Sequence, residues 1–113
     1  MEVLNEFELA ILEKLSADYP VIGKHVPYLR VKERRVTGTA MYVGLAYIRG
    51  AESLDFIPLK HLSTKGYLKM EGLQDGLIDG TTVVDGRIDK IELMTYDEPW
   101  DGSIRKFFWA EKF

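Results

Sequence analysis

The stretch that decides the fold of this chain reads Val83-Val84-Asp85-Gly86-Arg87-Ile88-Asp89-Lys90-Ile91-Glu92-Leu93-Met94-Thr95-Tyr96. Its Asp85-Gly86 pair stands between two β-branched residues and a long alternating run. Such a pair favours a two-residue type I′ turn, because both central residues of that turn need a positive φ. The stretch therefore predicts a β-hairpin.

Upstream of the hairpin, residues 5–19 have the pattern of an amphipathic helix. Asn5 is a typical N-cap, Glu8 three residues later completes a capping box, and Pro20 disfavours helical geometry at the residue before it. The apolar residues at helical spacing form one stripe, made of Leu4, Phe7, Ala10, Ile11 and Leu15. We expect this helix to cover one face of a sheet.

The rest of the chain reads as strands joined mostly by short turns. Residues 28–37 are rich in long charged side chains and predict an edge strand. Residues 39–48 are almost entirely apolar and predict a central strand buried on both faces. Residues 49–65 look irregular, and Asp79-Gly80 predicts a further turn. Other strands are predicted at 66–73, 81–84 and 104–110.

One helix followed by five to six strands predicts a single α+β domain over residues 1–113. The N-terminal helix should pack on a curved antiparallel sheet. A parallel α/β fold would need several more helices, and the sequence does not supply them.

The composition excludes several classes of protein. The chain has no cysteine, which excludes disulfides, thiolate catalysis and cysteine-based metal sites. No apolar run approaches the length of a membrane helix. The acidic N-terminus is unlike a signal peptide, so we expect a cytoplasmic protein that does not contact a membrane. A pI near 5.4 argues against nucleic acid as a partner.

Charge is unevenly distributed along the chain, whose formal net charge is −3. Residues 71–101 carry nine acidic and two basic residues, a net charge of −7, whereas residues 20–70 carry nine basic and three acidic residues. An acidic region of this kind can meet a basic surface on a protein partner. Folding can also bring the blocks together and cancel the field.

Isolated histidines and acids give only weak catalytic signals. His25 or His61 could pair with Glu92 or Asp97 as an acid–base group, but two ordinary loop histidines are the favoured alternative. Four aspartates suggest calcium, yet turn chemistry explains them better because three precede glycine; they are Asp75, Asp79, Asp85 and Asp89. The sequence therefore predicts no catalytic residue, no metal site and no cofactor.

Alternation along the second strand of the hairpin places Glu92 on a mixed face with Ile88, Lys90, Met94 and Tyr96. If that face lined a cavity, desolvation would suit Glu92 to act as a general acid. A cross-strand ion pair with Arg105 or Lys106 is the favoured alternative. For a small-ligand site in a pocket between helix and sheet, the candidate binding residues are Glu92, Tyr42 and Tyr96.

One basic run suggests phosphate or nucleic acid, and it consists of Arg30, Lys32, Arg34 and Arg35. It lacks a Gly-rich phosphate loop, so a solvated edge strand is the favoured interpretation. Simple alternation puts Arg34 and Val36 on the face opposite Leu29 and Val31.

Aromatic residues gather near the C-terminus, at Trp100, Phe107, Phe108, Trp109 and Phe113. Alternation puts Phe107, Trp109 and Phe113 on one face and Phe108 on the other, so both faces of the last strand are apolar. A core role is the favoured interpretation, and a homodimer through the C-terminal strand is the alternative.

Two segments resemble small uncharacterised bacterial proteins of similar length. The first runs from Glu33 to Tyr42 and contains a basic-Thr-Gly pattern, and the second runs from Asp85 to Trp100. The resemblance implies the α+β fold and a bacterial source. It carries no known activity, and no functional residue is transferred from it. This chain departs from the pattern at Ala40, where glycine is usual, and at Leu93-Met94.

The leading functional prediction is a non-enzymatic protein-interaction module, such as an inhibitor or a toxin-neutralising immunity protein. It rests on the lack of a catalytic motif and on the acidic region at 71–101. The alternative is a small-ligand-binding protein or minor enzyme with a pocket between helix and sheet.

Overall fold

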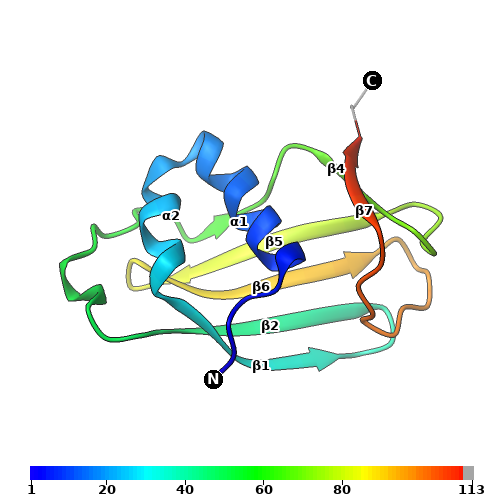
Figure 1. Cartoon of the computed structure of the whole chain (residues 1–113). Coiled ribbons are helices and arrows are strands. Elements are labelled where there is room, and N and C mark those ends of the chain that lie inside the picture. Colours follow the sequence, from blue (N-terminus) through cyan, green and yellow to red (C-terminus); the bar gives the residue numbers. More distant parts are fainter. Residues whose placement is uncertain (111–113) are drawn as a thin grey trace.

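The computed structural model describes residues 1–110 and confirms the α+β class. Helix α1 (Glu6–Asp18) packs on one face of an open, seven-stranded antiparallel sheet (Figure 1). The spatial order is β1-β2-β6-β5-β4-β7. The short strand β3 lies off this path and pairs with another part of β5 than β4 does. The strands are β1 (Leu29–Val36), β2 (Ala40–Tyr47), β3 (His61–Leu62), β4 (Tyr67–Met70), β5 (Leu77–Val84), β6 (Arg87–Thr95) and β7 (Phe107–Ala110).

The N-terminal helix begins as predicted, with a complete capping box. The Asn5 side chain accepts a hydrogen bond from the Glu8 N–H (2.8 Å), and the Glu8 carboxylate accepts one from the Asn5 N–H (2.9 Å). A second helix, α2 (Pro20–His25), was not predicted. Proline is favoured in the first turn of a helix, where its missing N–H would have no partner. Pro20, which was predicted to stop the first helix, therefore also begins α2.

The hairpin that joins β5 to β6 is confirmed. Asp85 and Gly86 have φ angles of 50° and 77°, the positive values that a type I′ turn requires at both central residues. Val83 then lies opposite Ile88, and Val84 lies opposite Arg87.

Alternation predicted the wrong faces for the second half of β1. The register with β2 shifts between Val31 and Glu33, so Lys32 is an extra residue at a β-bulge. Beyond the bulge Arg34 lies opposite Val43, which faces the helix. Arg34 therefore lies on the same face as Val31, not on the opposite one.

A second bulge corrects the predicted faces of β6. The register with β5 shifts between Thr82, opposite Lys90, and Val83, opposite Ile88, which leaves Asp89 unpaired. Ile88 is only 1% exposed and belongs to the core. It does not share a face with Glu92.

The turn predicted at Asp79-Gly80 does not form, because β5 runs straight through both residues. The Asp79 side chain is buried beneath the sheet, where its carboxylate accepts hydrogen bonds from the backbone N–H (2.8 Å) and the hydroxyl of Thr64. Gly80 has no positive φ. A buried, hydrogen-bonded aspartate thus replaces the expected turn.

The core lies between the helices and one face of the sheet, and both helices lie on that side (Figure 1). Phe7 and Ile11 of α1 are at most 1% exposed, as are Val43 of β2 and Ile91 of β6. None of the helices in the described residues is long and apolar enough to cross a membrane.

The aromatic C-terminal strand contributes to this core on one face only. Phe107 packs edge-on against Phe7 with ring centroids 4.9 Å apart, and Lys14 lies over the Trp109 ring. Phe108 points to the other side and is 60% exposed. Phe113, predicted on the same face as Phe107, lies outside the described residues.

Candidate functional site

The face of the sheet turned away from the helices carries the predicted binding residues Tyr42 and Glu92. Side chains alternate along a strand, so the neighbours of buried Val43 and Ile91 point outward. We call this surface the open face and define it by the outward-facing residues of β1, β2, β5 and β6: Arg35, Tyr42, Ile78, Gly80, Lys90, Glu92 and Met94.

Tyr42 lies at the centre of the open face. Its direct partner on β6 is Glu92. Two cations flank its ring, the Arg35 guanidinium at 5.4 Å and the Lys90 ammonium at 5.8 Å from the ring centroid. Lys90 Nζ also lies 3.0 Å from Glu92 Oε1. These contacts hold the Tyr42 ring between two cations.

Beside the tyrosine lies an exposed apolar pair. Ile78 and Met94 are direct cross-strand partners, and they are 40% and 37% exposed. The neighbouring Gly80 lies opposite Glu92, and a Cβ at Gly80 would meet no atom within 4 Å. The open face thus combines a fixed aromatic ring, two exposed apolar side chains and bare backbone.

The structure brings two of the three predicted binding residues together and leaves the third apart. Tyr42 and Glu92 are direct partners. Tyr96 follows the end of β6, about 13 Å further along the strand direction. The expected position between helix and sheet is wrong, because that side is occupied by the core. Glu92 does form an ion pair, but with Lys90 of its own strand and not with Arg105 or Lys106.

His25 is buried in a hydrogen-bonded network that the sequence did not reveal. Its Nε2 lies 2.7 Å from the Asp55 carbonyl oxygen, which can only accept, so Nε2 carries the hydrogen. Its Nδ1 then accepts from the Tyr47 hydroxyl (2.8 Å), and that oxygen accepts from the Ile88 N–H (2.7 Å). Burial raises the pKa of Tyr47, against the effects of the Ile88 N–H and of Arg87. The network joins α2 to the sheet.

The other candidate ionic groups are dispersed. His61 is exposed on β3, and in the described residues no hydrogen bond joins either histidine to Glu92 or Asp97. Between residues 1 and 110, no three His, Asp or Glu side chains gather as metal ligands would. The basic run is divided between the two faces of β1, since Arg34 faces the helix while Arg35 lies on the open face.

The acidic region at 71–101 does not form one surface. Asp79 is buried, and Asp85 and Asp89 lie at the hairpin end of the sheet. At the other end, the Glu98 carboxylate accepts hydrogen bonds from the N–H groups of Gln74 (2.7 Å) and Asp75 (2.8 Å). These bonds lower the pKa of Glu98, the Asp75 bond most. They join the loops 71–76 and 96–103, which we call the acidic loop end. Its acidic residues are Glu71, Asp75, Asp97, Glu98 and Asp101.

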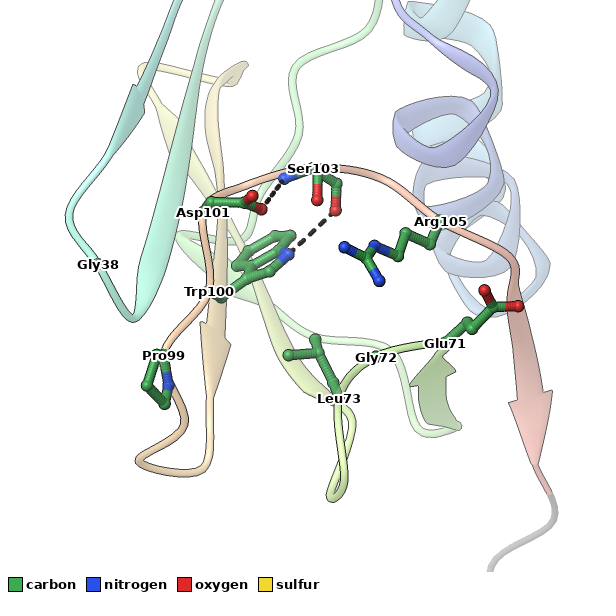
Figure 2. A pocket seen from close by; sticks show the side chains of 9 residues that line it. All are labelled: Gly38, Glu71, Gly72, Leu73, Pro99, Trp100, Asp101, Ser103 and Arg105. Atoms are coloured by element: carbon green, nitrogen blue, oxygen red, sulfur yellow. Dashed lines mark hydrogen bonds between the residues drawn. The ribbon is translucent and has the colours of Figure 1, made fainter.

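A cleft of about 450 Å³ opens at the acidic loop end. Figure 2 shows the Arg105 side chain extending toward Trp100, whose indole N–H donates to the Ser103 carbonyl (3.0 Å). Hydrogen bonds from Ser103 lower the pKa of Asp101 at the rim. The cleft therefore sets one guanidinium among carboxylates, a mixture that favours neither an anionic nor a cationic small ligand. It is a weaker candidate site than the open face.

Sequence reasoning placed Met94 on the face of Glu92 but did not place Ile78 or Gly80 there. One signal for that face was present, because β2 is apolar at nearly every position and predicted burial on both sides. The structure covers only one of those sides, and Tyr42 on the other is half-buried. Comparison of the chain with protein-family models, curated proteins and solved structures finds no match.

Proposed function

We propose that this chain is a non-enzymatic protein-binding module that holds its partner on the open face of its sheet. The observation that carries the proposal is Tyr42, fixed between Arg35 and Lys90 beside the exposed pair Ile78 and Met94. Tyrosine, arginine and methionine are enriched in protein interfaces, and tyrosine and arginine are frequent hot spots. A rigid aromatic anchor costs little conformational entropy when a partner binds.

The acidic loop end supports a more definite description of the partner. Tyr96 and Asp97 follow directly on from β6, whose outward side chains form much of the open face. A partner that covers Ile78 and Met94 would therefore extend toward this acidic border. We infer a protein with an apolar patch bordered by basic residues. In this description the chain itself is an inhibitor or an immunity protein, and it covers a basic active surface of its partner.

The test is affinity purification from cells of the source organism with matched variants as bait. Gly80→Lys adds a side chain in open space, and Ile78→Lys replaces an exposed residue, so neither should disturb the core. Both variants should lose the partner by at least about tenfold in affinity, as expected for changes at the centre of an interface. Thermal unfolding should show that each variant remains folded.

The control is Val3→Lys, which places the same charge at a 70% exposed apolar residue outside the open face. This variant should retain the partner as wild type does. The proposal fails if the partner retained by wild type is retained equally by Gly80→Lys and Ile78→Lys. It also fails if wild type retains no stoichiometric partner.

A further inference from the structure

The two edges of the sheet are built very differently. The β1 edge is protected in three ways: by charged side chains, by the bulge at Lys32, and by residue 2. Glu2 forms a bridge with Val31, donating its N–H to the Val31 carbonyl (3.0 Å) and accepting the Val31 N–H (2.7 Å). These devices prevent one sheet from pairing with another.

The β7 edge has none of these protections. Phe107–Ala110 contains no charged residue, no register shift interrupts its pairing with β4, and in residues 1–110 no strand covers its second side. An apolar edge that has neither charge nor bulge is a template for another strand.

The register identifies which backbone groups face the free side of β7. Glu71 donates its N–H to the Lys106 carbonyl (2.8 Å), so this pair is hydrogen-bonded. Hydrogen-bonded and non-hydrogen-bonded pairs alternate in antiparallel sheets. Phe108, opposite Lys69, is therefore hydrogen-bonded to β4, whereas Phe107 and Trp109 direct their N–H and C=O groups outward.

We propose that two copies of this chain pair β7 with β7, antiparallel and centred on Phe108. Phe107 of each copy then exchanges two hydrogen bonds with Trp109 of the other copy. The four bonds use every outward N–H and C=O group of these two residues. The two Phe108 residues form the central non-hydrogen-bonded pair, in which Cα atoms approach to about 4.5 Å. Their rings, each 60% exposed in the single chain, cover one another.

A second copy suits this edge for two reasons. Pairing β7 with the β1 edge of another copy would produce an open filament, and the protections on β1 oppose it; β7 with β7 is a two-fold contact that closes at two chains. Arg105 and Lys106 precede the run, so parallel pairing would set these cations side by side, whereas antiparallel pairing keeps them at opposite ends. The contact is independent of the partner proposed for the open face.

The test is sedimentation velocity of the full chain over a rising concentration series, with amide hydrogen exchange on the same samples. Wild type should pass from monomer to dimer. The amides of Phe107 and Trp109 should become protected only as dimer forms, whereas the Phe108 amide, bonded to β4, should be protected throughout. Phe108→Lys should remain monomeric, because it sets two cations against each other at the centre.

The matched control is Phe56→Lys, which changes a similarly exposed phenylalanine elsewhere on the surface and should leave the dimer intact. The proposal is overturned if wild type stays monomeric throughout, or if Phe108→Lys dimerises like wild type. It is also overturned if a dimer forms while the Phe107 and Trp109 amides exchange freely.

Discussion

Arg34 on β1 holds the Glu8 carboxylate of α1 with two hydrogen bonds, Nε to Oε2 at 2.8 Å and Nη2 to Oε1 at 2.9 Å. Glu8 is completely buried, and Arg34 also reaches Glu2 at 2.6 Å. The bonds to Glu8 raise the pKa of Arg34 above its ordinary value, although burial opposes them. The carboxylate that caps α1 is thus also the group that fastens the helix to the sheet.

Arg34→Met should lower the free energy of unfolding by about 3 kcal/mol, because it leaves the buried Glu8 carboxylate without its cation. Urea unfolding measures this change. Arg35→Met, one residue away on the open face, should cost less than about 1 kcal/mol. Equal losses in the two variants would show that the bulge at Lys32 does not direct Arg34 toward the helix.

Two glycines that each follow an aspartate should respond oppositely to alanine. Gly80 lies mid-strand in open space, so Gly80→Ala should stabilise the protein by about 0.5 kcal/mol. Gly86 has a φ of +77°, and a Cβ there would clash with the Phe56 ring, so Gly86→Ala should cost at least about 1 kcal/mol. Thermal unfolding of both variants decides between this result and equal effects, which would contradict the assignment of Gly80 to a strand.

The raised pKa of Tyr47 predicts how the free energy of unfolding responds to alkaline pH. Its pKa is raised in the folded protein, so its contribution is complete below the ordinary tyrosine pKa and is lost as pH rises through the folded value. Tyr47→Phe should cost about 1–3 kcal/mol at neutral pH, since His25 and the Ile88 N–H lose their partner. The variant should also lose less of its free energy of unfolding between neutral and alkaline pH than wild type does. Urea unfolding across the pH range measures both, and an unchanged alkaline slope would contradict the network.

The lowered pKa of Glu98 predicts a response to low pH at the acidic loop end. Its pKa is lowered, so its contribution is present above the ordinary glutamate value and is lost as pH falls through the folded value. In an NMR titration, the amide signals of Gln74 and Asp75 should move together with protonation of Glu98. The same signals in Glu98→Gln should lack that transition. Its persistence in the variant would assign it to another group.

The sequence predicted the elements better than it predicted their faces. The capping box and the Asp85-Gly86 turn depend on residues adjacent in the chain, and both are confirmed. The bulges at Lys32 and Asp89 each insert one residue, which reverses every side chain beyond it, and alternation carries no sign of such an insertion.

Other errors arose from contacts between distant parts of the chain. Asp79-Gly80 carries the same local turn signal as Asp85-Gly86, yet Thr64 binds the Asp79 carboxylate and keeps β5 continuous. The network of His25 with Tyr47 joins residues that are 22 positions apart. The sequence was sufficient to choose Tyr42 and Glu92 as candidate site residues. It did not predict that they share the face of the sheet turned away from the helices.

The most direct test of the open face is methyl cross-saturation NMR of the chain in complex with its retained partner. Saturation of the partner should reduce the methyl signals of Ile78 and Met94 and leave those of Leu59, an exposed residue outside the open face, unchanged. Transfer to Leu59 with none to Ile78 and Met94 would contradict the account, because the partner would then bind elsewhere.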